Sequence, residues 1–572
     1  MMLMMWALDA VANPSVPPRH PAPVPPGPRV HHLGYFSDQP IRIQWTAGPS
    51  LPPPRRGSLR DARGRIVARA KFGPPRLDPR ARVAVSEVQF DGVKPGTYTV
   101  RIGKVRQALI VSNAPYASTV TTMLRSYYLQ RCGVEIDDAV TGLAHAPCHV
   151  NDGVVEDSTI QTGTQVASHG GWHDAGDFGK YVAPLAHTLA RLLTLHERNP
   201  TLAGDGTLRI PESDNGRSDL VDEVWVGLDW LMTAQREDGA VYRKLSGQQW
   251  PGMASPDTDT QPRYLFGVST PETAKFAGVL ALAARVLGPS DPKRATRCLN
   301  AAQRAWQWLD AQPDQTIDRG PHDDKGSGGY LASDIDREAA LRTDQDDRLY
   351  AAIQLALASG RSDWDEAIRQ RLPTDGSLRV TLAEWKDLSS LALVDLVRHA
   401  PERLQDVVPS VRQALIARAR EALARAEASP HHLANHRLVW GSNKMTAEEG
   451  HLLLMGHELT QDARFLEAAR WQADWAFGLN PLDRTFVTGI GPRSVAHVSH
   501  HWARTLPDGT TIPGLVVGGP NEGAQANVAA ENWGVRSYAD VAQSYATNEN
   551  AIDYNAALIA LVVELSRALG PS

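Results

Sequence analysis

Helical periodicity dominates the chain from about residue 117 to its end. Apolar residues recur at three- and four-residue spacings, as in Leu185, Leu189 and Leu192, and this places one apolar stripe on each helix. Clusters of Gly, Pro and Asp separate one helical run from the next. Many paired helices with little strand pattern predict a helical toroid, although the pattern alone also suits an α-solenoid. The clearest predicted helices cover residues 185–193, 276–287, 301–309, 349–358 and 551–569.

Residues 30–112 follow a different pattern, in which apolar and polar residues alternate between Gly and Pro turns. The runs at residues 41–45, 83–90 and 97–102 are the clearest. Period-two alternation indicates antiparallel strands, and a segment of this length predicts a small β-sandwich. A chain of 572 residues exceeds what one core usually supports, so two domains are expected. Because it shows no obvious aromatic platform, we expect the sandwich to support the larger domain rather than to bind sugars.

The N-terminal segment has an unusual composition. Residues 1–12 form a short apolar run that ends in Ala-x-Ala, as a secretory signal does, but the basic start of such a signal is missing. Both interpretations of residues 1–12, a secretory signal and a simple disordered start, remain open. Residues 14–28 are dense in proline and predict an extended tether. No later stretch is apolar enough to span a bilayer, and a net charge of -5 gives no reason to expect nucleic acid or anionic membrane as a partner.

Residues 170–181 read GGWHDAGDFGKY and place two carboxylates, Asp174 and Asp177, three residues apart on a glycine-hinged loop. Glycine allows the backbone to approach a ligand closely, and Trp172 and Phe178 offer flat apolar surfaces for a sugar ring. Paired carboxylates can share general acid and general base catalysis. An Asx-rich surface turn or a calcium loop would use the same residue types, so the loop alone leaves these interpretations open.

Further motifs follow this loop along the chain. They are IPESDNG at 210–216, LDWL at 228–231, QREDGAVY at 235–242, PRY at 262–264, STPETAKF at 269–276, WGSN at 440–443, GLNP at 478–481, VTG at 487–489, GGPN at 518–521 and NENAIDYNAAL at 548–558. In this order they resemble glycoside hydrolase family 9, whose members are mostly inverting cellulases. The resemblance spans about residues 115–570.

The resemblance implies a multidomain architecture. The catalytic domain of the family is an all-α (α/α)6 barrel, and a small immunoglobulin-like β-sandwich often precedes it. We therefore expect a signal remnant and a disordered Pro-rich segment in residues 1–29, the immunoglobulin-like sandwich in residues 30–113 and the barrel in residues 114–572.

The resemblance also assigns catalytic roles. Asp177 would be the general base, Asp174 would hold and polarise the water, and Glu549 in the last motif would be the general acid. In hydrolysis with inversion the two carboxyl groups lie roughly 6.5 to 9.5 Å apart, on opposite sides of the sugar ring. Without the resemblance, Glu549 would be interpreted as a glutamate that favours the N-terminus of a helix.

Cysteine usage indicates a second group of residues. Residues 131–135, RCGVE, resemble a segment that contributes to a structural zinc site in a subset of the family. Two thiolates and two imidazoles would satisfy tetrahedral zinc. The alternatives are a disulfide between the first two cysteines and ligation by His169 in place of His173. Cys298 falls in a helical run and is expected to be a core thiol. The predicted zinc ligands are Cys132, Cys148, His149 and His173.

One stretch departs from the family pattern. Where family cellulases carry a His-His-Arg stretch that touches sugars, residues 493–502 read RSVAHVSHHW, without an arginine after the paired histidines. His500 or Ser499 then takes the place of the sugar-contacting histidine, and a histidine cluster without a sugar contact is the alternative. Loss of a charge-assisted hydrogen bond predicts altered binding of the sugar at one subsite. The predicted substrate-binding residues are His500, Trp440, Tyr264 and Phe178.

Taken together, these features predict a secreted or periplasmic, monomeric glycoside hydrolase. We expect an endoglucanase that cleaves β-1,4 bonds of cellulose or a related β-glucan with inversion. The alternatives are an exo-acting β-glucosidase or β-glucosaminidase on oligosaccharides and, more remotely, an inactive glycan-binding protein. No organic cofactor is expected. Calcium is a further candidate ligand at the Asp-rich segments 334–336 and 344–347, although such segments are more often solvated turns.

Overall fold

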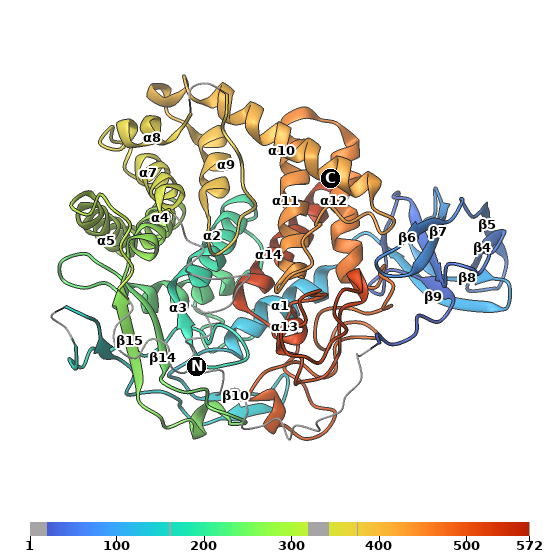
Figure 1. Cartoon of the computed structure of the whole chain (residues 1–572), viewed down its shortest axis with the longest axis horizontal. Coiled ribbons are helices and arrows are strands. Elements are labelled where there is room, and N and C mark those ends of the chain that lie inside the picture. The colour runs from blue at the N-terminus through green and yellow to red at the C-terminus, as the bar shows by residue number, and fades with distance from the viewer. Residues whose placement is uncertain (1–19, 160–161, 319–342, 374–375, 571–572) are drawn as a thin grey trace.

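The computed structural model describes residues 20–159, 162–318, 343–373 and 376–570. A β-sandwich lies at one end of the molecule and a larger helical domain fills the rest (Figure 1). None of the described helices is long and apolar enough to cross a bilayer. The apolar run at residues 1–12 and the Asp-rich segment 334–336 lie outside the described residues.

Two sheets form the sandwich, and the predicted alternating runs lie in three of its strands. Inward-facing side chains such as Ile41, Leu59, Val88 and Val100 build its apolar core. The first sheet has the order β1 (Gly27–Arg29), β3 (Ile41–Ala47), β7 (Val83–Phe90), β6 (Arg76–Asp78), and the second has the order β2 (Tyr35–Phe36), β9 (Val105–Ser112), β8 (Gly96–Ile102), β4 (Arg56–Asp61), β5 (Ile66–Lys71).

Polar side-chain contacts attach the first sheet to the helical domain. Arg42 of β3 contacts Asp474 at 2.7 Å, and Glu87 of β7 contacts His432 at 2.8 Å. Burial lowers the pKa of His432, and its hydrogen bond to Glu87 opposes this. Because the Arg42 and Asp474 side chains are both less than a tenth exposed, the two domains share a closed interface rather than a flexible joint.

The helical domain is a ring of six helix pairs. The inner helices α2 (Val182–Arg198), α4 (Thr270–Leu287), α7 (Gln345–Ser359) and α9 (Ser389–His399) pack in succession, and α11 (Ser442–Thr460) packs on α14 (Ile552–Leu569), which returns to α2. α10 connects α9 with α11. This closed ring is the predicted toroid and not an open solenoid. The outer partners are α3 (Asp219–Thr233), α5 (Pro292–Asp310), α8 (Asp365–Arg371), α10 (Val408–Ala428), α12 (Ala463–Ala476) and α1 (Ala117–Tyr128).

Two adjacent helices, the inner α4 and the outer α5, differ in burial. α4 is buried along nearly its whole circumference, whereas α5 buries one stripe that includes Cys298, Ala302 and Ala305. Cys298 is fully buried in the main core, as predicted for a core thiol. Four of the five predicted helices fall within α2, α4, α5 and α7, and the fifth, 551–569, begins one residue before α14.

A small sheet inside the helical domain was not predicted. Its order is β12 (Val154–Glu156), β15 (Arg263–Val268), β14 (Tyr242–Gly247), β13 (Lys180–Tyr181). β13 pairs with β14 directly after the loop at residues 170–179, and α2 begins at the next residue. The sheet therefore fixes the C-terminal end of that loop.

Candidate active site

A cavity of about 670 Å³ lies where the inner helices α2, α11 and α14 begin. Asp174 and Asp177 reach it from the loop before β13, and Glu549 reaches it from the turn between α13 (Tyr545–Asn548) and α14. The three predicted catalytic carboxylates, which are far apart in the sequence, therefore line one cavity.

Backbone pairing brings these segments together. An isolated bridge joins Ala175 to Ala551, and a second joins Ser499 to Glu549. Gly176 lies between them, and a Cβ atom at this position would come within 2.1 Å of the Ser499 carbonyl oxygen and 3.1 Å of Glu549 Oε1. Only glycine permits this close approach of the loop to Glu549.

Buried polar contacts hold the loop from behind. Trp172 Nε1 donates to Glu223 Oε2 at 3.0 Å, and Arg131 pairs with the other oxygen of Glu223 at 2.6 Å. Lys180 Nζ donates to the Gly170 carbonyl at 3.0 Å. Since these side chains are buried, the loop has little freedom to move relative to the helices.

The surroundings of two of the carboxyl groups differ. Burial, and then the charge of Asp177, raise the pKa of Glu549 well above its usual value. Burial also raises the pKa of Asp177, but Tyr181 Oη donates to Asp177 Oδ2 at 2.9 Å and opposes this rise. Acid and base catalysis in one cavity requires such a difference between neighbouring carboxyl groups.

Asp174 has a different environment. Burial, followed by the charges of Asp553, Asp177 and Glu549, raises its pKa well above the usual value. Its Oδ1 atom is buried and has no hydrogen-bond partner among the described residues. An unsatisfied carboxylate oxygen on a residue that lines the cavity can accept a hydrogen bond from water or from a sugar hydroxyl.

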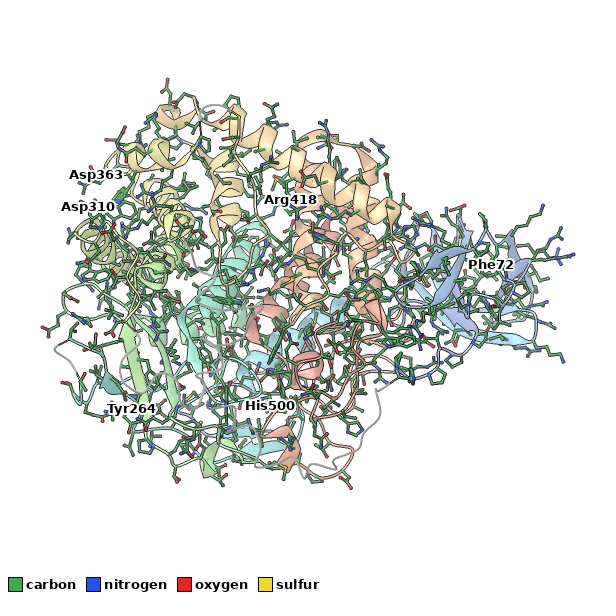
Figure 2. The ribbon with its side chains drawn as sticks, viewed as in Figure 1. Phe72, Tyr264, Asp310, Asp363, Arg418 and His500 are labelled. Carbon is green, nitrogen blue, oxygen red and sulfur yellow. The ribbon has the colours of Figure 1, made fainter. Side chains whose placement is uncertain are left out.

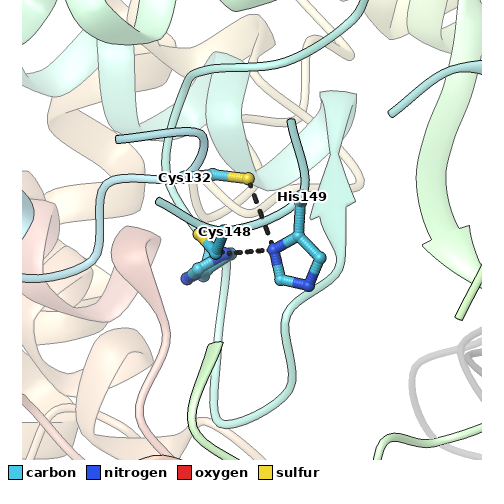
Figure 3. A group of neighbouring side chains, drawn as sticks. Cys132, Cys148 and His149 are labelled. Atoms are coloured by element: carbon cyan, nitrogen blue, oxygen red, sulfur yellow. Dashed lines mark hydrogen bonds between the residues drawn. The ribbon is translucent and has the colours of Figure 1, made fainter. Parts of the chain in front are cut away.

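A second cluster lies on the other side of the same loop. Its four ligand atoms, one each from Cys132, Cys148, His149 and His173, all lie within 4.8 Å of one another. His149 Nδ1 is 3.3 Å from His173 Nε2 and 3.7 Å from Cys132 Sγ, and Cys148 Sγ is 3.8 Å from His173 Nε2. Figure 3 shows Cys132, Cys148 and His149 converging on one point.

The alternatives for this cluster are less well supported. All three cysteines are free thiols, so Cys132 and Cys148 do not form a disulfide in this structure. His173 is 2% exposed within the cluster, whereas His169 is exposed to solvent and is not a member of the group. The structure thus brings together the four residues that the sequence predicted.

Comparison with known proteins identifies the family. The model of glycosyl hydrolase family 9 matches residues 116–562. The chain belongs to this family. Endoglucanase D of Acetivibrio thermocellus is 28% identical over 499 residues, which cover 84% of this chain and 75% of that protein. The crystal structure of a metagenome-derived family 9 endoglucanase is 35% identical, with a TM-score of 0.87 over 94% of this chain and 99% of that one. A Zn-binding triple mutant of the family 9 endoglucanase J30 is 32% identical, with a TM-score of 0.86 over 93% of this chain and 99% of that one.

Membership in family 9 makes the protein a glycoside hydrolase. The similarity to family 9 structures also confirms the predicted architecture, in which a β-sandwich precedes an (α/α)6 barrel.

The predicted substrate-binding residues of this family 9 enzyme do not all lie at the cavity. Trp440 and His500 line it, and the Trp440 ring lies 5.4 Å from that of Tyr545. Phe178 is buried between the cavity and the cysteine and histidine cluster, with its ring 5.0 Å from that of His173. Tyr264 belongs to β15 and is not among the described residues that line the cavity. Figure 2 labels Tyr264 and His500 on separate segments of the barrel.

An arginine reaches the cavity from an unexpected position. Arg504 follows the paired histidines by three residues, lies in a short 3-10 helix (Ala503–Thr505) and lines the cavity. Among the described residues, no carboxylate forms an ion pair with its guanidinium. The sequence pattern revealed the missing arginine after His501 but did not predict Arg504 at the cavity, because the fold of the segment after His501 decides where this residue lies.

The sequence also did not reveal a buried ion pair at the cavity wall. Lys444 Nζ lies 2.9 Å from Asp553 Oδ2, and both side chains are no more than 3% exposed. Lys444 directly follows the motif WGSN at 440–443, and Asp553 lies within the last motif at 548–558. Their pairing across more than a hundred residues has no local sequence pattern.

Two of the described calcium candidates are paired with cations. Asp344 contacts Arg348 at 3.0 Å, and Asp347 contacts the buried Lys275 at 2.5 Å. These ion pairs explain Asp344 and Asp347 but not the neighbouring Asp346, whose Oδ1 is buried without a hydrogen-bond partner among the described residues.

Proposed function

We propose that the protein is an inverting endo-β-1,4-glucanase that acts on cellulose or a related β-glucan. Glu549 is the general acid, Asp177 is the general base, and Asp174 holds the attacking water. The proposal depends on one observation above all. Two buried carboxyl groups lie at the same cavity, and the pKa of Glu549 is raised well above its usual value while the Tyr181 hydrogen bond opposes the rise at Asp177. The similarity to endoglucanase D supports the substrate class.

The reaction is a single displacement at the anomeric carbon. Glu549 gives its proton to the glycosidic oxygen as the bond from that oxygen to C1 breaks. A water attacks C1 from the opposite face and loses a proton to Asp177. The two products are a shortened glucan with a free hydroxyl and a glucan whose new reducing end has the inverted, α configuration. Exchange with solvent returns the proton from Asp177 and restores Glu549.

Asp174 completes the base side of this site. Its Oδ1, which has no hydrogen-bond partner among the described residues, can accept a hydrogen bond from the second O–H of the attacking water, while Tyr181 keeps Asp177 oriented. Burial and three neighbouring carboxyl groups raise the pKa of Asp174. The Lys444 ammonium, which pairs with Asp553, opposes part of this rise.

The walls of the cavity support action within a glucan chain. Trp250, Trp385 and Trp440 come from three separate segments and offer surfaces on which successive sugar rings can stack. Arg504, also at the wall, can supply the charge-assisted contact of the missing arginine. An exo-acting enzyme would need one end of the cavity closed, and that is the alternative.

Early products from cellohexaose test this function. Internal fragments of several lengths, with the α-anomer first in proton NMR, are the expected result. Release of only glucose or glucosamine from chain ends would indicate an exo-enzyme, and β-anomers formed first would contradict inversion. If no glycan is cleaved, the protein is a glycan-binding protein.

A structural zinc ion is part of the proposal. Zinc bonds of 2.0 to 2.3 Å in a tetrahedron place ligand atoms roughly 3.3 to 3.8 Å apart. The separations of 3.3, 3.7 and 3.8 Å in the cluster fit this range. The similar J30 triple mutant, described as Zn-binding, shows that a family 9 scaffold can accept this ion. Bound zinc would tie residues 132 and 148–149 to His173 and so stabilise the catalytic loop.

The proposed substrate also bears on location and assembly. A polymeric glucan does not cross a bilayer, so we expect a secreted or periplasmic enzyme. Fractionation of producing cells, with activity measured on soluble cellulose, tests the location. Size-exclusion chromatography should show a monomer of 62.3 kDa.

A further inference from the structure

The sandwich and the barrel carry opposite charges. Residues 27–112 contain 16 Lys and Arg residues against 5 Asp and Glu residues, a net charge of +11. Because the whole chain carries -5, the remaining residues carry -16. The modest total therefore conceals a strongly basic domain attached to an acidic one.

Strand register gathers these cations on one face. In β4 and β8 the buried Leu59 and Val100 point into the sandwich, so their neighbours Arg60 and Arg101 point outward. The pairing of β4 with β5 and of β8 with β9 places further cations beside them on the same side. We call this surface the basic face, and its cations are Arg56, Arg60, Arg69, Lys71, Arg101 and Arg106.

Like charges lie directly opposite one another on the basic face. Arg56 is paired with Lys71 across β4 and β5, and Arg101 is paired with Arg106 across β8 and β9. Such pairs destabilise a sheet. Within the described part of the chain, no carboxylate forms an ion pair with any cation of the basic face. The fold alone gives no reason for this arrangement, so an external anion would relieve the repulsion.

The basic face is turned away from the barrel. The first sheet contacts the barrel through Arg42 and Glu87, and the basic face belongs to the second sheet. In Figure 1 the labels β4, β5 and β8 lie at the far end of the sandwich from the helices. A partner could therefore cover this face without blocking the catalytic cavity.

We propose that the basic face binds a linear anionic polysaccharide, carboxylated or sulfated, and thereby holds the barrel beside glycan material. Five of the six cations are arginines, whose planar guanidinium groups match the geometry of carboxylate and sulfate oxygens. Between them, Ser58, Thr97 and Thr99 present hydroxyl groups that can bond to sugar hydroxyls. The proposal does not depend on which β-glucan the barrel cleaves.

Other polyanions fit the basic face less well. Its outward positions on β4, β8 and β9 are Arg, Ser, Thr, Ala and Ile, so it lacks the aromatic rings on which single-stranded nucleic acid stacks. A flat sheet face also has no protruding element that could enter a groove of a duplex. A lipid bilayer would favour inserting apolar side chains, and the positions between the cations are divided between the hydroxyl groups of Ser58, Thr97 and Thr99 and the apolar side chains of Ala108 and Ile110. Lipid vesicles are therefore included in the test.

Affinity electrophoresis tests this proposal with the full-length protein. Polygalacturonate in the gel should retard the wild-type protein at low salt, and neutral dextran should not. Because the Debye length falls from about 10 Å at 0.1 M salt to 3 Å at 1 M, high salt should abolish the retardation. The triple variant R56S/R101S/R106S should bind polygalacturonate at least tenfold more weakly, with cellohexaose hydrolysis unchanged.

A matched control separates the face from net charge. Lys293, Arg297 and Arg420 are exposed cations of α5 and α10, so the variant K293S/R297S/R420S loses the same charge elsewhere. It should keep wild-type retardation. The face variant should unfold at the wild-type temperature or above it, because repulsion is removed. The proposal is overturned if wild type is not retarded, if both variants weaken equally, or if phosphatidylglycerol vesicles or duplex DNA bind as tightly as polygalacturonate.

Discussion

The three carboxylates and the cysteine and histidine cluster lie on opposite sides of one loop, and their polar atoms differ in the partners that they contact. The four cluster atoms lie within 4.8 Å of one another, and none of the four residues lines the cavity. The three carboxylates face the cavity, and Asp174 Oδ1 has no hydrogen-bond partner in the part of the chain that the structure describes. Polar atoms that can satisfy one another through a metal are typical of a structural site, whereas buried atoms left unsatisfied are typical of a reactive one.

The two sites are adjacent in the chain as well as in space. His173 N donates to the Gln130 carbonyl at 2.8 Å, and Asp174 N donates to the Gly179 carbonyl at 2.9 Å. Successive residues of the loop thus belong to different sites. If the comparison is correct, changes at the carboxylates abolish turnover without unfolding, and changes at the cluster lower stability first.

The largest effect should come from the general acid. Glu549→Gln keeps the shape of the side chain but removes its proton, so kcat should fall by about 10³-fold, within the usual range for acid catalysis. The unfolding temperature, measured by calorimetry, should stay near the wild-type value. Glu384→Gln is the matched control, because Glu384 lines the same cavity but pairs with Arg437 at 2.7 Å. Wild-type turnover in Glu549→Gln would remove this residue from the mechanism.

The pH dependence of turnover provides the next test. Asp177 must be ionised, so activity should be lost as pH falls through its raised pKa. Glu549 must be protonated, so activity should be lost as pH rises through its own raised pKa. A bell-shaped profile of kcat/KM is expected, with its acid limb above the ordinary range of aspartate. Asp177→Asn should lower kcat by about 10³-fold, and an acid limb that persists in this variant would argue against Asp177 as the base.

Zinc removal should act mainly on stability. Cys148→Ser or chelation should reduce the zinc content from about one per chain to none, as a four-ligand site predicts. At a free zinc concentration 1,000 times Kd the ion stabilises by about 4 kcal/mol. We therefore expect an unfolding temperature lower by several degrees and a smaller, zinc-reversible loss of activity.

Two controls sharpen this experiment. Cys298→Ser removes a fully buried thiol that lies outside the cluster and should leave zinc content unchanged. His169→Ala should also retain zinc, whereas His173→Ala should lose it. Purified wild-type protein without zinc, or a Cys132–Cys148 disulfide found by mass spectrometry, would show that the cluster is not a metal site.

Sequence patterns predicted those parts of the molecule that local chemistry determines. The 3.6-residue period predicted the helices around Leu185 and Phe276, and the two-residue period predicted strands such as that at residues 83–90. Motif order located the three carboxylates, Cys132 and His173 because these side chains lie inside the motifs themselves. Cys148 and His149 lie outside the quoted motifs and were predicted from their residue types.

Sequence patterns did not predict the features that depend on contacts between segments far apart in the chain. The aromatic character of Phe178 and Tyr264 suggested sugar contacts, but neither ring is among the described residues that line the 670 Å³ cavity. The Phe178 ring lies 5.0 Å from that of His173, and Tyr264 lies in β15, a strand that was not predicted. The pairing of Lys444 with Asp553 depends on how α11 and α14 pack, and no local window of sequence contains it.

The smallest expected effect separates orientation from chemistry within the carboxylate site. Tyr181→Phe removes the hydrogen bond to Asp177 and leaves the carboxylate in place. A hydrogen bond to a charged group contributes about 1.5 to 3 kcal/mol, and one pKa unit corresponds to 1.36 kcal/mol. The hydrogen bond favours ionised Asp177, so its loss should raise the pKa of Asp177 and move the acid limb of kcat/KM to higher pH. Because water replaces part of the lost hydrogen-bond energy, we expect a shift of about one pH unit. Tyr264→Phe, in the same sheet but outside the cavity, should leave the limb unmoved. A uniform fall in activity at every pH would instead mean that Tyr181 supports the loop without tuning its base.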